Sequence, residues 1–593
     1  MNYVISAAVV LASYLLVMRV FGVNKVIWRY ASSGDYLKIF FVTTASGLLA
    51  CLILEFTAFD MVPTLFNFLG ALSCSLVLTF SRIFYREVII LSSNKAQGDE
   101  KRLLIVGAGA AGSRMIDEIK TNPACGLNPI GFIDDDPQKV NRILRGVKVL
   151  GKISDIEKIC KENKIELIYI AIPSSSNEQR AYILEECAKT TCSVKILPYY
   201  TSIADDSGYI NKVRDITPEE LLGREPIKVA GEDILSFVKD KVIAITGGGG
   251  SIGSELCRQI AANSPKRLII IDVYENCAYA IQQELKLKYG TSLDTEVYIA
   301  TVCDFKKINS LFKLEKPDVV IHAAAHKHVP LMETVPDECV KNNVFGTLNT
   351  ALATRNNGIK KFILISTDKA VNPTNIMGAT KRICEMIIQY VDSISPETTF
   401  AAVRFGNVLG SNGSVIPLFK NQIEKRQDVT VTHPEMIRYF MTIPEASQLV
   451  LTASAMANGG EIFVLDMGKP VKIDDLARKM ISLSGLVIGK DINIKYVGLR
   501  PGEKLYEELL MSEEGLRKTL NEKIFIGNAI HMDYEKFQKQ LDELGMIVET
   551  ADVTPEQVED KLKEIVPTFK RYVPVKVEDT VSRKFEIPVS AAH

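Results

Sequence analysis

Three long apolar runs without charged side chains open the chain, and strand-like and helix-like patterns alternate after them. The runs cover residues 2–18, 39–54 and 61–81. Each is close to the roughly 17 to 25 residues that cross a bilayer as a helix, and three in succession favour membrane insertion over buried core helices. We therefore expect a transmembrane region over residues 1–95, with helices at about residues 2–22, 38–57 and 61–81.

Charged residues are distributed unevenly around these runs. Positive side chains lie after the first and third runs, whereas the loop after the second run carries Glu55 and Asp60. The positive residues are Lys25, Arg29, Lys38, Arg82 and Arg86. Loops rich in Lys and Arg stay in the cytoplasm, so we expect a multi-pass protein of the cell membrane whose N-terminus lies outside and whose catalytic part lies in the cytoplasm. An outside start without a signal sequence is unusual, which leaves open whether a further helix is missing upstream of Met1.

Beyond residue 95, short apolar strands alternate with helical segments, which is the pattern of a parallel α/β sheet. The strand LLIVGAGAAG places Gly107, Gly109 and Gly112 at the GxGxxG spacing, and Asp134 ends the next strand 22 residues after Gly112. Such glycines let a phosphate approach a helix N-terminus, and an acid at this distance binds a ribose. We expect a Rossmann-like domain of unknown ligand over residues 96–200. A glycine turn that binds no nucleotide remains an alternative.

A second, longer α/β pattern covers residues 241–550, after a connector over residues 201–240. Its first turn, TGGGGSIGSEL, has the GxxGxxG spacing between a strand and a helix. Asp272 ends the next strand 19 residues after the last of these glycines, which suits a ribose diol and opposes a 2'-phosphate. The sequence thus predicts NAD rather than NADP as cofactor. The residues expected to hold it in this turn are Gly247, Gly250, Ser251, Ile252 and Gly253.

Two further strand ends of this domain carry candidate cofactor contacts. Asp304 is placed to hold an adenine amino group, with a solvated turn acid as the alternative, and Ala323 is small enough to lie against a cofactor. His322, His326 and His328 have no acidic or cysteine partner at metal-site spacing. We therefore expect no metal site and expect these histidines to line a pocket.

The most informative segment is the strand FILIST with the residues that follow it. The strand ends in Thr367, Asp368 and Lys369, and Met377 and Lys381 come next at a four-residue spacing. A tyrosine four residues before a lysine is the usual acid/base pair of short-chain dehydrogenases, because one helical turn puts both side chains on one face. Met377 occupies the tyrosine position and carries no proton. Adjacent Asp368 and Lys369 supply an acid and a base that an ordinary dehydrogenase does not need, although an exposed salt bridge is the alternative.

Composition narrows the class of protein further. The chain has 593 residues, of which 47% are hydrophobic and 24% charged, which indicates several folded domains rather than disorder. Its formal net charge of -1 gives no overall attraction to nucleic acid, so we expect no nucleic-acid partner. The 11 cysteines form no CxxC pair and no dense framework, which predicts a reduced environment without structural disulfides.

Six motifs, in this order, resemble those of the membrane-bound nucleotide-sugar 4,6-dehydratases of polysaccharide and glycan biosynthesis, which are extended short-chain dehydrogenase/reductase proteins. The motifs are TGGGGSIGSEL, HAAAHKHVPLME, NNVFGTLNT, STDKAVNPTNIMGATKR, VRFGNVLGSNGSV and GLRPGEKLYEE. The resemblance covers the whole chain and is nearest to UDP-N-acetylglucosamine 4,6-dehydratases, whose long members carry methionine where Met377 stands. The departure is at the N-terminus, where the family typically has four spanning helices and this chain shows three.

The fold class that follows is α/β. N-terminal transmembrane helices should precede two Rossmann-like, doubly wound parallel sheets. The second of these is expected to be an extended short-chain dehydrogenase/reductase domain, with a small C-terminal substrate lobe mainly after residue 405. Residues 551–593 should form a C-terminal helix and a loose tail.

The resemblance implies a reaction and roles for these residues. Oxidation at C4 of the hexose makes the C5 proton acidic, water leaves across C5 and C6, and the hydride returns to C6. Asp368 would then be the acid at C6 and Lys369 the base at C5, which requires Lys369 to be partly neutral through burial or the nearby Lys381. Lys381 would hold the nicotinamide ribose, and Thr367 would hydrogen-bond near the C4 hydroxyl. The proton acceptor during C4 oxidation has no firm assignment, because Met377 is silent.

Recognition of the UDP part should come from the C-terminal part of the domain, because a diphosphate needs fixed cations. By resemblance, the substrate-binding residues are His326, Lys327, Asn407, Arg438, Arg500 and Glu503, with Glu503 on the uridine ribose. Arg404 lies beside Asn407 in the same motif. Ordinary ion pairs at a domain edge are the alternative for the arginines.

The sequence therefore predicts a lyase, an NAD-dependent UDP-N-acetylglucosamine 4,6-dehydratase. A UDP-sugar 4-epimerase of the same fold is the nearest alternative, although the Asp368 and Lys369 pair argues against it. A catalytically silent, membrane-bound nucleotide-sugar sensor or scaffold is the alternative from another class. The expected partners are a UDP-sugar, the membrane and a second copy of the chain, because extended members of the superfamily pair through a four-helix interface that would include the helix after Met377.

Overall fold

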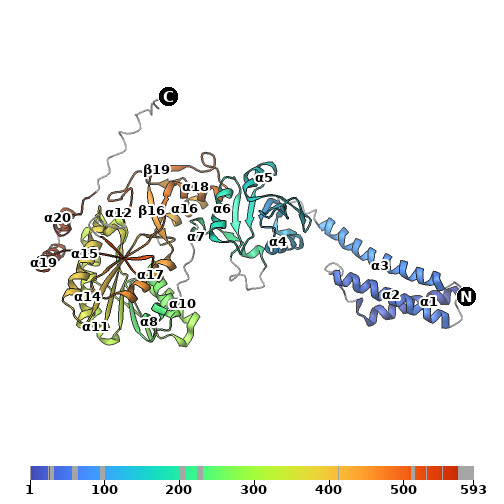
Figure 1. Cartoon of the computed structure of the whole chain (residues 1–593), viewed down its shortest axis with the longest axis horizontal. Helices are drawn as coiled ribbons and strands as arrows, with labels where there is room; N and C mark the ends of the chain where they lie inside the picture. The colour runs from blue at the N-terminus through green and yellow to red at the C-terminus, as the bar shows by residue number, and fades with distance from the viewer. Residues whose placement is uncertain are drawn as a thin grey trace, which may run out of the picture. The chain divides into compact units, whose positions relative to one another are not determined.

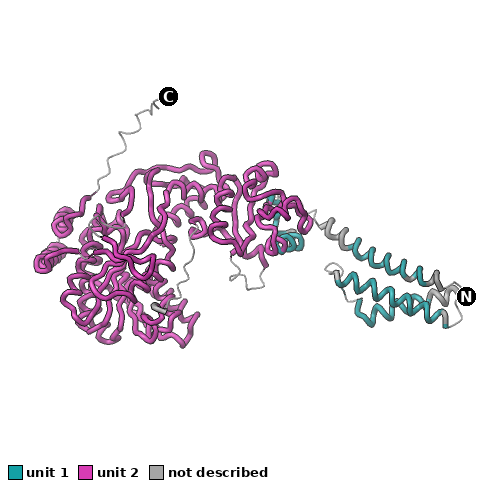
Figure 2. Tube along the Cα trace, viewed as in Figure 1, with its two compact units in different colours: residues 1–102, 114–129 teal, residues 103–113, 130–593 magenta. Residues whose placement is uncertain are grey.

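The computed structural model divides into two compact units, which Figure 2 shows in teal and magenta. One comprises residues 1–102 and 114–129, and the other comprises residues 103–113 and 130–593. The described residues are 2–23, 26, 33–56, 64–93, 100–198, 208–222, 232–411, 413–508, 515–528, 530–550 and 552–571. The expectations for Lys25, Arg29, Asp60 and the tail beyond residue 571 lie outside them.

The N-terminal apolar runs form three helices. They are α1 (Asn2–Val20), α2 (Ser33–Phe56) and α3 (Thr64–Ser93), and α2 contacts both of the others. By length and composition, two segments are suited to cross a membrane, Gly34–Leu54 and Phe68–Tyr85. The described apolar part of α1, Ala8–Val20, is shorter than a bilayer span. Membrane association through this region is therefore plausible, and the number of spans and their orientation stay predictions.

The first Rossmann-like part is built on a seven-stranded sheet of order β3-β4-β2-β1-β5-β6-β7. Its strands are β1 (Lys101–Val106), β2 (Leu127–Ile133), β3 (Ile143–Leu144), β4 (Val147–Gly151), β5 (Leu167–Ile170), β6 (Ser193–Ile196) and β7 (Arg214–Asp215). The helices that alternate with them are α4 (Ala110–Thr121), α5 (Ile156–Glu162) and α6 (Asn177–Ala188), and the connector contributes α7 (Pro218–Leu221). Strands β1, β5 and β6 run parallel.

The second sheet has nine strands in the order β10-β9-β8-β11-β12-β13-β17-β21-β20. The strands from β10 to β17 run parallel, and β21 and β20 are added antiparallel. The strands are β8 (Val242–Thr246), β9 (Arg267–Asp272), β10 (Thr295–Ile299), β11 (Val319–His322), β12 (Lys361–Thr367), β13 (Thr399–Phe405), β17 (Ile462–Leu465), β20 (Leu516–Lys518) and β21 (Ile524–Gly527). The central strands are buried on both faces, as parallel strands between two helix layers are.

Helices cover both faces of this sheet and form two separate cores (Figure 1). On one face lie α11 (Phe305–Glu315), α14 (Gly346–Asn356), α15 (Ile376–Ser393), α19 (Tyr534–Glu549) and α20 (Pro555–Ile565). On the other face lie α8 (Glu232–Val238), α9 (Ser251–Ala262), α10 (Glu275–Tyr289) and α17 (Ile443–Met456). Short helices α12 (Val329–Met332) and α13 (Pro336–Cys339) follow β11. This doubly wound arrangement confirms the predicted fold class.

A small lobe is built from segments after residue 405 and has its own apolar core. Its strands are β14 (Asn407–Val408), β15 (Val429–Val431), β16 (Ile437–Met441), β18 (Pro470–Lys472) and β19 (Ile494–Tyr496), and its helices are α16 (Val415–Glu424) and α18 (Ile473–Leu483). Strand β16 pairs with both β14 and β18. Because β14 follows directly from β13, the lobe continues the carboxyl end of the main sheet.

Helix α15, which begins next to Met377, is almost entirely covered by its own chain. All but three of its 18 residues are buried, and its neighbours include α14, β13 and α20. On the same face, Tyr390 packs its ring against those of Tyr534 and Phe537 from α19. Within the described residues, α19 and α20 pack on the same face as this helix, and the expected pairing of two copies through it stays a prediction.

We expect the C-terminal helices to contribute directly to the stability of the second sheet. Leu544 of α19 is 0% exposed within the core of that face, whereas Met546 of the same helix is 65% exposed. Leu544→Ala should lower the free energy of unfolding of this domain, measured by urea titration, by about 2–5 kcal/mol because it leaves a cavity. Met546→Ala is the matched control and should change it little. Equal effects of the two substitutions would contradict this packing.

Candidate active site

Two adjoining cavities lie where the parallel strands of the second sheet end. One has a volume of about 510 Å³ and is lined by the glycine turn after β8, the end of β11 and the end of β12. The other has a volume of about 260 Å³ and is lined mainly by the small lobe and by residues 500–507. They share Lys327, His328, Lys369, Asn407, Gly413 and Ser414. Ligands of doubly wound folds bind at this edge of the sheet.

The glycine turn after β8 is shaped so that side chains cannot be added to it. A Cβ atom on Gly253 would lie 2.1 Å from the Gly247 carbonyl oxygen, and Gly247 itself has a φ of 69°. A Cβ atom on Gly247 would lie 2.7 Å from the backbone nitrogen of Ala324. The turn therefore brings the first turn of α9 directly against β8 and leaves the N-terminus of the helix open to the larger cavity, as phosphate binding requires.

Asp272 borders this turn at the end of β9. Its carboxylate accepts hydrogen bonds from the Gly249 backbone nitrogen at 2.9 Å and from the Tyr274 backbone nitrogen at 2.9 Å. Gly250, Ser251, Ile252 and Ala323 line the larger cavity together with Gly247 and Gly253. This set of residues fits a dinucleotide whose ribose keeps a free diol. The exposed carboxylate of Asp304 caps α11 by accepting from the Lys307 nitrogen at 3.0 Å, and its contact with an adenine stays a prediction.

Thr367, Asp368 and Lys369 come together at the end of β12 as the sequence predicts. Thr367 Oγ1 donates to Asp368 Oδ1 at 2.9 Å, and Lys369 Nζ lies 3.0 Å from the same oxygen. Lys369 Nζ also donates to Asn407 Oδ1 at 3.3 Å. Asp368 is 0% exposed, and its Oδ2 is a buried atom without a hydrogen-bond partner in the described part of the chain. Lys369 therefore lines both cavities while Asp368 is buried beside it, and the pair is no exposed salt bridge.

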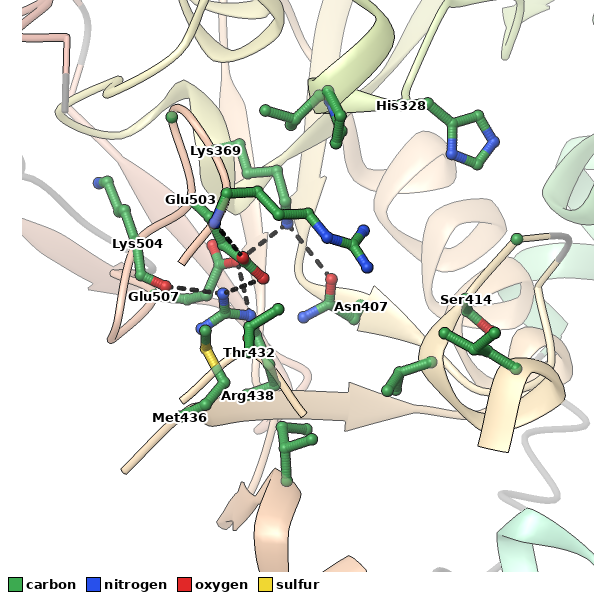
Figure 3. Close-up of a pocket in the computed structure, with 18 of the residues that line it drawn as sticks. His328, Lys369, Asn407, Ser414, Thr432, Met436, Arg438, Glu503, Lys504 and Glu507 are labelled. Atoms are coloured by element: carbon green, nitrogen blue, oxygen red, sulfur yellow. Dashed lines mark hydrogen bonds and ion pairs between the residues drawn. The ribbon is translucent and has the colours of Figure 1, made fainter. Parts of the chain in front are cut away.

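Glu507 belongs to the same cluster, although sequence reasoning did not single it out. Its Oε1 lies 3.2 Å from Lys369 Nζ and 3.2 Å from Arg438 Nε, and its side chain is only 4% exposed. Figure 3 shows Lys369, Asn407, Arg438 and Glu507 converging from separate elements. The only sequence signal was a second acid four residues after Glu503 in GLRPGEKLYEE.

Burial and this cluster set the protonation of the pair. Burial raises the pKa of Asp368, and the negative charge of Glu507 raises it further. Burial alone would lower the pKa of Lys369, but the carboxylates of Asp368 and Glu507 outweigh it and the net pKa is raised. For Glu507, burial is outweighed by Lys369 and Arg438, so its pKa is lowered. The expected partly neutral Lys369 is thus wrong for the ligand-free protein.

Met377 and Lys381 face the larger cavity from the first turns of α15. Met377 is 3% exposed, and Lys381 Nζ donates to the Ile365 carbonyl oxygen at 2.8 Å. The four-residue spacing therefore places both side chains on one wall of the cavity, as expected from the helical period. No proton donor stands at the position of Met377.

The predicted substrate residues separate into two groups. His326, Lys327 and Asn407 line the larger cavity, and Lys327, Asn407, Arg438, Arg500 and Glu503 line the smaller one. Arg438 is almost fully engaged by its own chain: it donates to the Lys504 and Leu505 carbonyl oxygens at 2.7 and 3.1 Å and pairs with Glu503 at 3.6 Å. Arg500 is exposed at the rim, and its backbone nitrogen donates to Glu503 Oε2 at 3.1 Å.

Lys504 is a further cation of the smaller cavity that sequence reasoning did not single out. Its Nζ donates to the Val371 carbonyl oxygen at 2.8 Å. Burial lowers its pKa.

Two candidate residues belong to the core instead. His322 is 1% exposed and is hydrogen-bonded between Thr246 at 2.7 Å and Thr347 at 3.1 Å, and burial lowers its pKa to about 3. His322 was expected to line the pocket, but it does not. Arg404 is 0% exposed and pairs with Glu385 at 2.8 Å, so its guanidinium is committed to the core and is not available to a nucleotide.

The first Rossmann-like part repeats one feature of the cofactor turn. Asp134 Oδ2 accepts from the Ala108 nitrogen at 2.9 Å, as Asp272 does from Gly249, and Gly107, Gly109 and Asp134 line a cavity of about 330 Å³. Lys139 pairs with Asp134 at 3.0 Å. Ligand binding here stays an open expectation.

Comparison with known proteins gives matches over nearly the whole chain. A family model described as a polysaccharide biosynthesis protein matches residues 243–529, and a model described as a CoA-binding domain matches residues 26–198. The chain is 42% identical over 548 residues to the probable polysaccharide biosynthesis protein EpsC of Bacillus subtilis, and the match covers 92% of this chain and 90% of the relative.

Two relatives with different activities each match just under half of the chain, almost equally well. A UDP-glucose 4-epimerase of Rickettsia bellii is 36% identical over 280 residues, covering 46% of this chain and 79% of that protein. An inverting UDP-N-acetylglucosamine 4,6-dehydratase of Campylobacter jejuni is 34% identical over 278 residues, covering 46% of this chain and 78% of that protein. Overall sequence similarity therefore does not distinguish the two reactions. The distinction has to come from the residues of the site.

The glycine turn gives a prediction about cofactor binding. Gly253→Ala should abolish binding of the dinucleotide, because its Cβ would lie 2.1 Å from a backbone oxygen. Gly250→Ala is the matched control: its Cβ would lie 3.2 Å from that same oxygen, so binding should weaken much less. The measurement is the NAD released per protein chain after denaturation of the purified variants. Equal NAD content in Gly253→Ala and the unmodified protein would contradict the proposed cradle.

Proposed function

The chain belongs to the polysaccharide biosynthesis proteins of the EpsC type, and we propose that it is an NAD-dependent UDP-N-acetylglucosamine 4,6-dehydratase tethered to the membrane. Enzymes of this extended short-chain dehydrogenase/reductase family modify nucleotide sugars as dehydratases or epimerases. The observation that supports a dehydratase rather than an epimerase is the buried Asp368, which is hydrogen-bonded to Lys369 at the wall of both cavities. An elimination of water needs both an acid and a base beside the sugar, whereas epimerisation at C4 needs neither at C5 and C6.

The glycine turn and Asp272 would hold NAD, with Lys381 and Ala323 at its nicotinamide end. When bound, this cofactor accepts a hydride from C4 and returns it to C6. The larger cavity holds the glycine turn at one end and Lys369 at the other, which would place the sugar between cofactor and acid/base pair. Thr367 would hydrogen-bond near the C4 hydroxyl.

Asp368 and Lys369 would carry the proton transfers of the elimination. In the ligand-free protein the pair holds the protonated form of Lys369, since its pKa is raised. A proton moving from Lys369 Nζ to Asp368 across their 3.0 Å contact produces both required forms at once. The amine of Lys369 can then take the C5 proton, and the acid of Asp368 can protonate the leaving C6 hydroxyl. Burial of Asp368 favours its neutral form in this exchange.

The UDP part would lie in the smaller cavity. Arg500 and Lys504 are the cations best placed for the diphosphate, because Arg500 is exposed at the rim and Lys504 lines the same cavity. Arg438 would act there mainly by fixing the 503–507 segment, since most of its donors bind that segment. Glu503 is our candidate for the uridine ribose, with Asn407 between sugar and nucleotide.

The second candidate function is a UDP-sugar 4-epimerase, which the similarity to the Rickettsia bellii protein favours. The Asp368 and Lys369 pair opposes it, because return of the hydride to C4 needs no acid or base at C5 and C6. A silent sensor or scaffold has no use for the buried Asp368 and Lys369 pair.

The function is tested by following UDP-N-acetylglucosamine with the full-length protein and substoichiometric NAD by NMR. A dehydratase should give a 4-keto-6-deoxy sugar with a C6 methyl signal, over many turnovers per NAD. Formation of the galacto isomer instead would establish the epimerase. Saturable UDP-sugar binding without conversion would favour the sensor and would overturn the proposal.

Substitutions of the acid/base pair test the assigned roles. Asp368→Asn and Lys369→Ala should each lower kcat by roughly a hundred- to ten-thousand-fold, because general acid and base groups contribute about that much. Affinity for UDP, measured by calorimetry, should stay within a few-fold of the unmodified protein, since neither residue is assigned to the diphosphate. Lys360→Ala, just before β12 and outside both cavities, is the control and should leave kcat unchanged. Full activity in either variant would show that the pair does not carry the elimination.

A further inference from the structure

Glu507 lines the smaller cavity and contacts Lys369, which lines both cavities. Its Oε1 atom is 3.2 Å from Lys369 Nζ and 3.2 Å from Arg438 Nε. Lys369 Nζ thereby has three acceptors, which are Asp368 Oδ1 at 3.0 Å, Asn407 Oδ1 at 3.3 Å and Glu507 Oε1. An ammonium has three N–H donors, so these contacts fix both its position and its orientation.

A carboxylate with a 4% exposed side chain is costly unless its charge is compensated. Lys369 and Arg438 supply that compensation, and Lys504 adds a weaker contribution from farther away. Packing of the lobe alone would be served by an amide or an apolar side chain at this position. A buried acid that touches an acid/base pair therefore points to a role in that pair's chemistry.

The charge of Glu507 acts on both members of the pair in the same direction. It attracts the Lys369 ammonium directly and repels the ionised form of Asp368, and so raises the pKa of both. Besides Glu507, Asp368 and Lys369 face each other's charge and the charge of Arg438. The positive charge of Arg438 lowers the pKa of Lys369 and so opposes the effect of Glu507 there. Lys504 also faces the pair. Loss of the Glu507 charge should therefore lower both proton affinities together.

We propose that Glu507 is a positioning residue for the proton transfers at the sugar: its carboxylate holds Lys369 Nζ against Asp368, and its charge acts on both members of the pair. This proposal rests on the proposed dehydratase function and adds a third acid to its machinery. Because Glu507 acts through Lys369, its contribution appears in the pH dependence of turnover rather than in substrate affinity.

The test is the pH profile of kcat for Glu507→Gln, which keeps the shape of the side chain and removes its charge. Both limbs of the bell should move to lower pH by about one unit, as expected for the loss of a charge within about 4–6 Å. The maximum should fall about ten-fold or more, because a less basic Lys369 is a weaker base. Glu508→Gln is the matched control: Glu508 is exposed and contacts Asn372 and Lys504, and its profile should coincide with that of the unmodified protein.

Two further measurements keep the outcome decisive. Glu507→Asp retains the charge, so its limbs should stay within about half a unit of the unmodified protein while kcat falls through lost positioning. The pKa of Lys369, measured by competitive acetylation and mass spectrometry over a pH series, should fall in Glu507→Gln whether or not any product forms. Unmoved limbs and an unchanged Lys369 pKa in Glu507→Gln would overturn the proposal. Absence of product from the unmodified protein, with a lowered Lys369 pKa in the variant, would instead overturn the dehydratase assignment alone.

Discussion

The site depends on one group of alternating charges, largely buried, at the carboxyl end of the second sheet. Asp368 and Lys369 come from the end of β12, Arg438 from β16 and Glu507 from the segment after residue 500, and successive members lie 3.0 to 3.2 Å apart. Each ion is tolerated because its neighbours compensate it, and removal of one leaves the others uncompensated. The strand end, the small lobe and the loop over the smaller cavity are therefore fixed together, and the proposed acid/base pair is already in contact in the ligand-free protein.

The covering of α15 is the second constraint on the site. The helix carries Met377 and Lys381 at its start, and Ile376 donates its backbone N–H to Glu333 at 2.7 Å. Glu333 is also bound by Arg571, at the end of the described C-terminal segment, at 2.9 Å. The C-terminal helices thus support the helix start that forms the cavity wall.

The sequence could predict a feature when all its residues lie close together in the chain. The glycine turn, Asp272, and the run from Thr367 to Lys369 lie at strand ends, so the strand pattern alone was enough to place them at one edge of the sheet. Ion pairs and hydrogen bonds between segments that are distant in the chain could not be predicted from a strand pattern. Arg404 stands in a motif that suggested a nucleotide contact, but its ion pair with Glu385 of α15 lies in the core. His322 is likewise a core residue, because its ring is hydrogen-bonded to Thr246 and Thr347. Glu507 was missed for the same reason, because only the fold brings it to Lys369. The fold class is confirmed, whereas the roles of the site residues stay predictions.

The methionine at position 377 can be compared with the proposed proton-carrying groups. Asp368 and Lys369 follow β12, and Glu507, which contacts Lys369, lines the smaller cavity, whereas a tyrosine at position 377 would stand on α15. Met377 is 3% exposed and belongs to an apolar core cluster. A tyrosine there would add a hydroxyl that needs a hydrogen-bond partner. With an apolar side chain at this position, the proton transfers of the proposed elimination fall to Asp368 and Lys369, whose charges are balanced by those of Glu507 and Arg438.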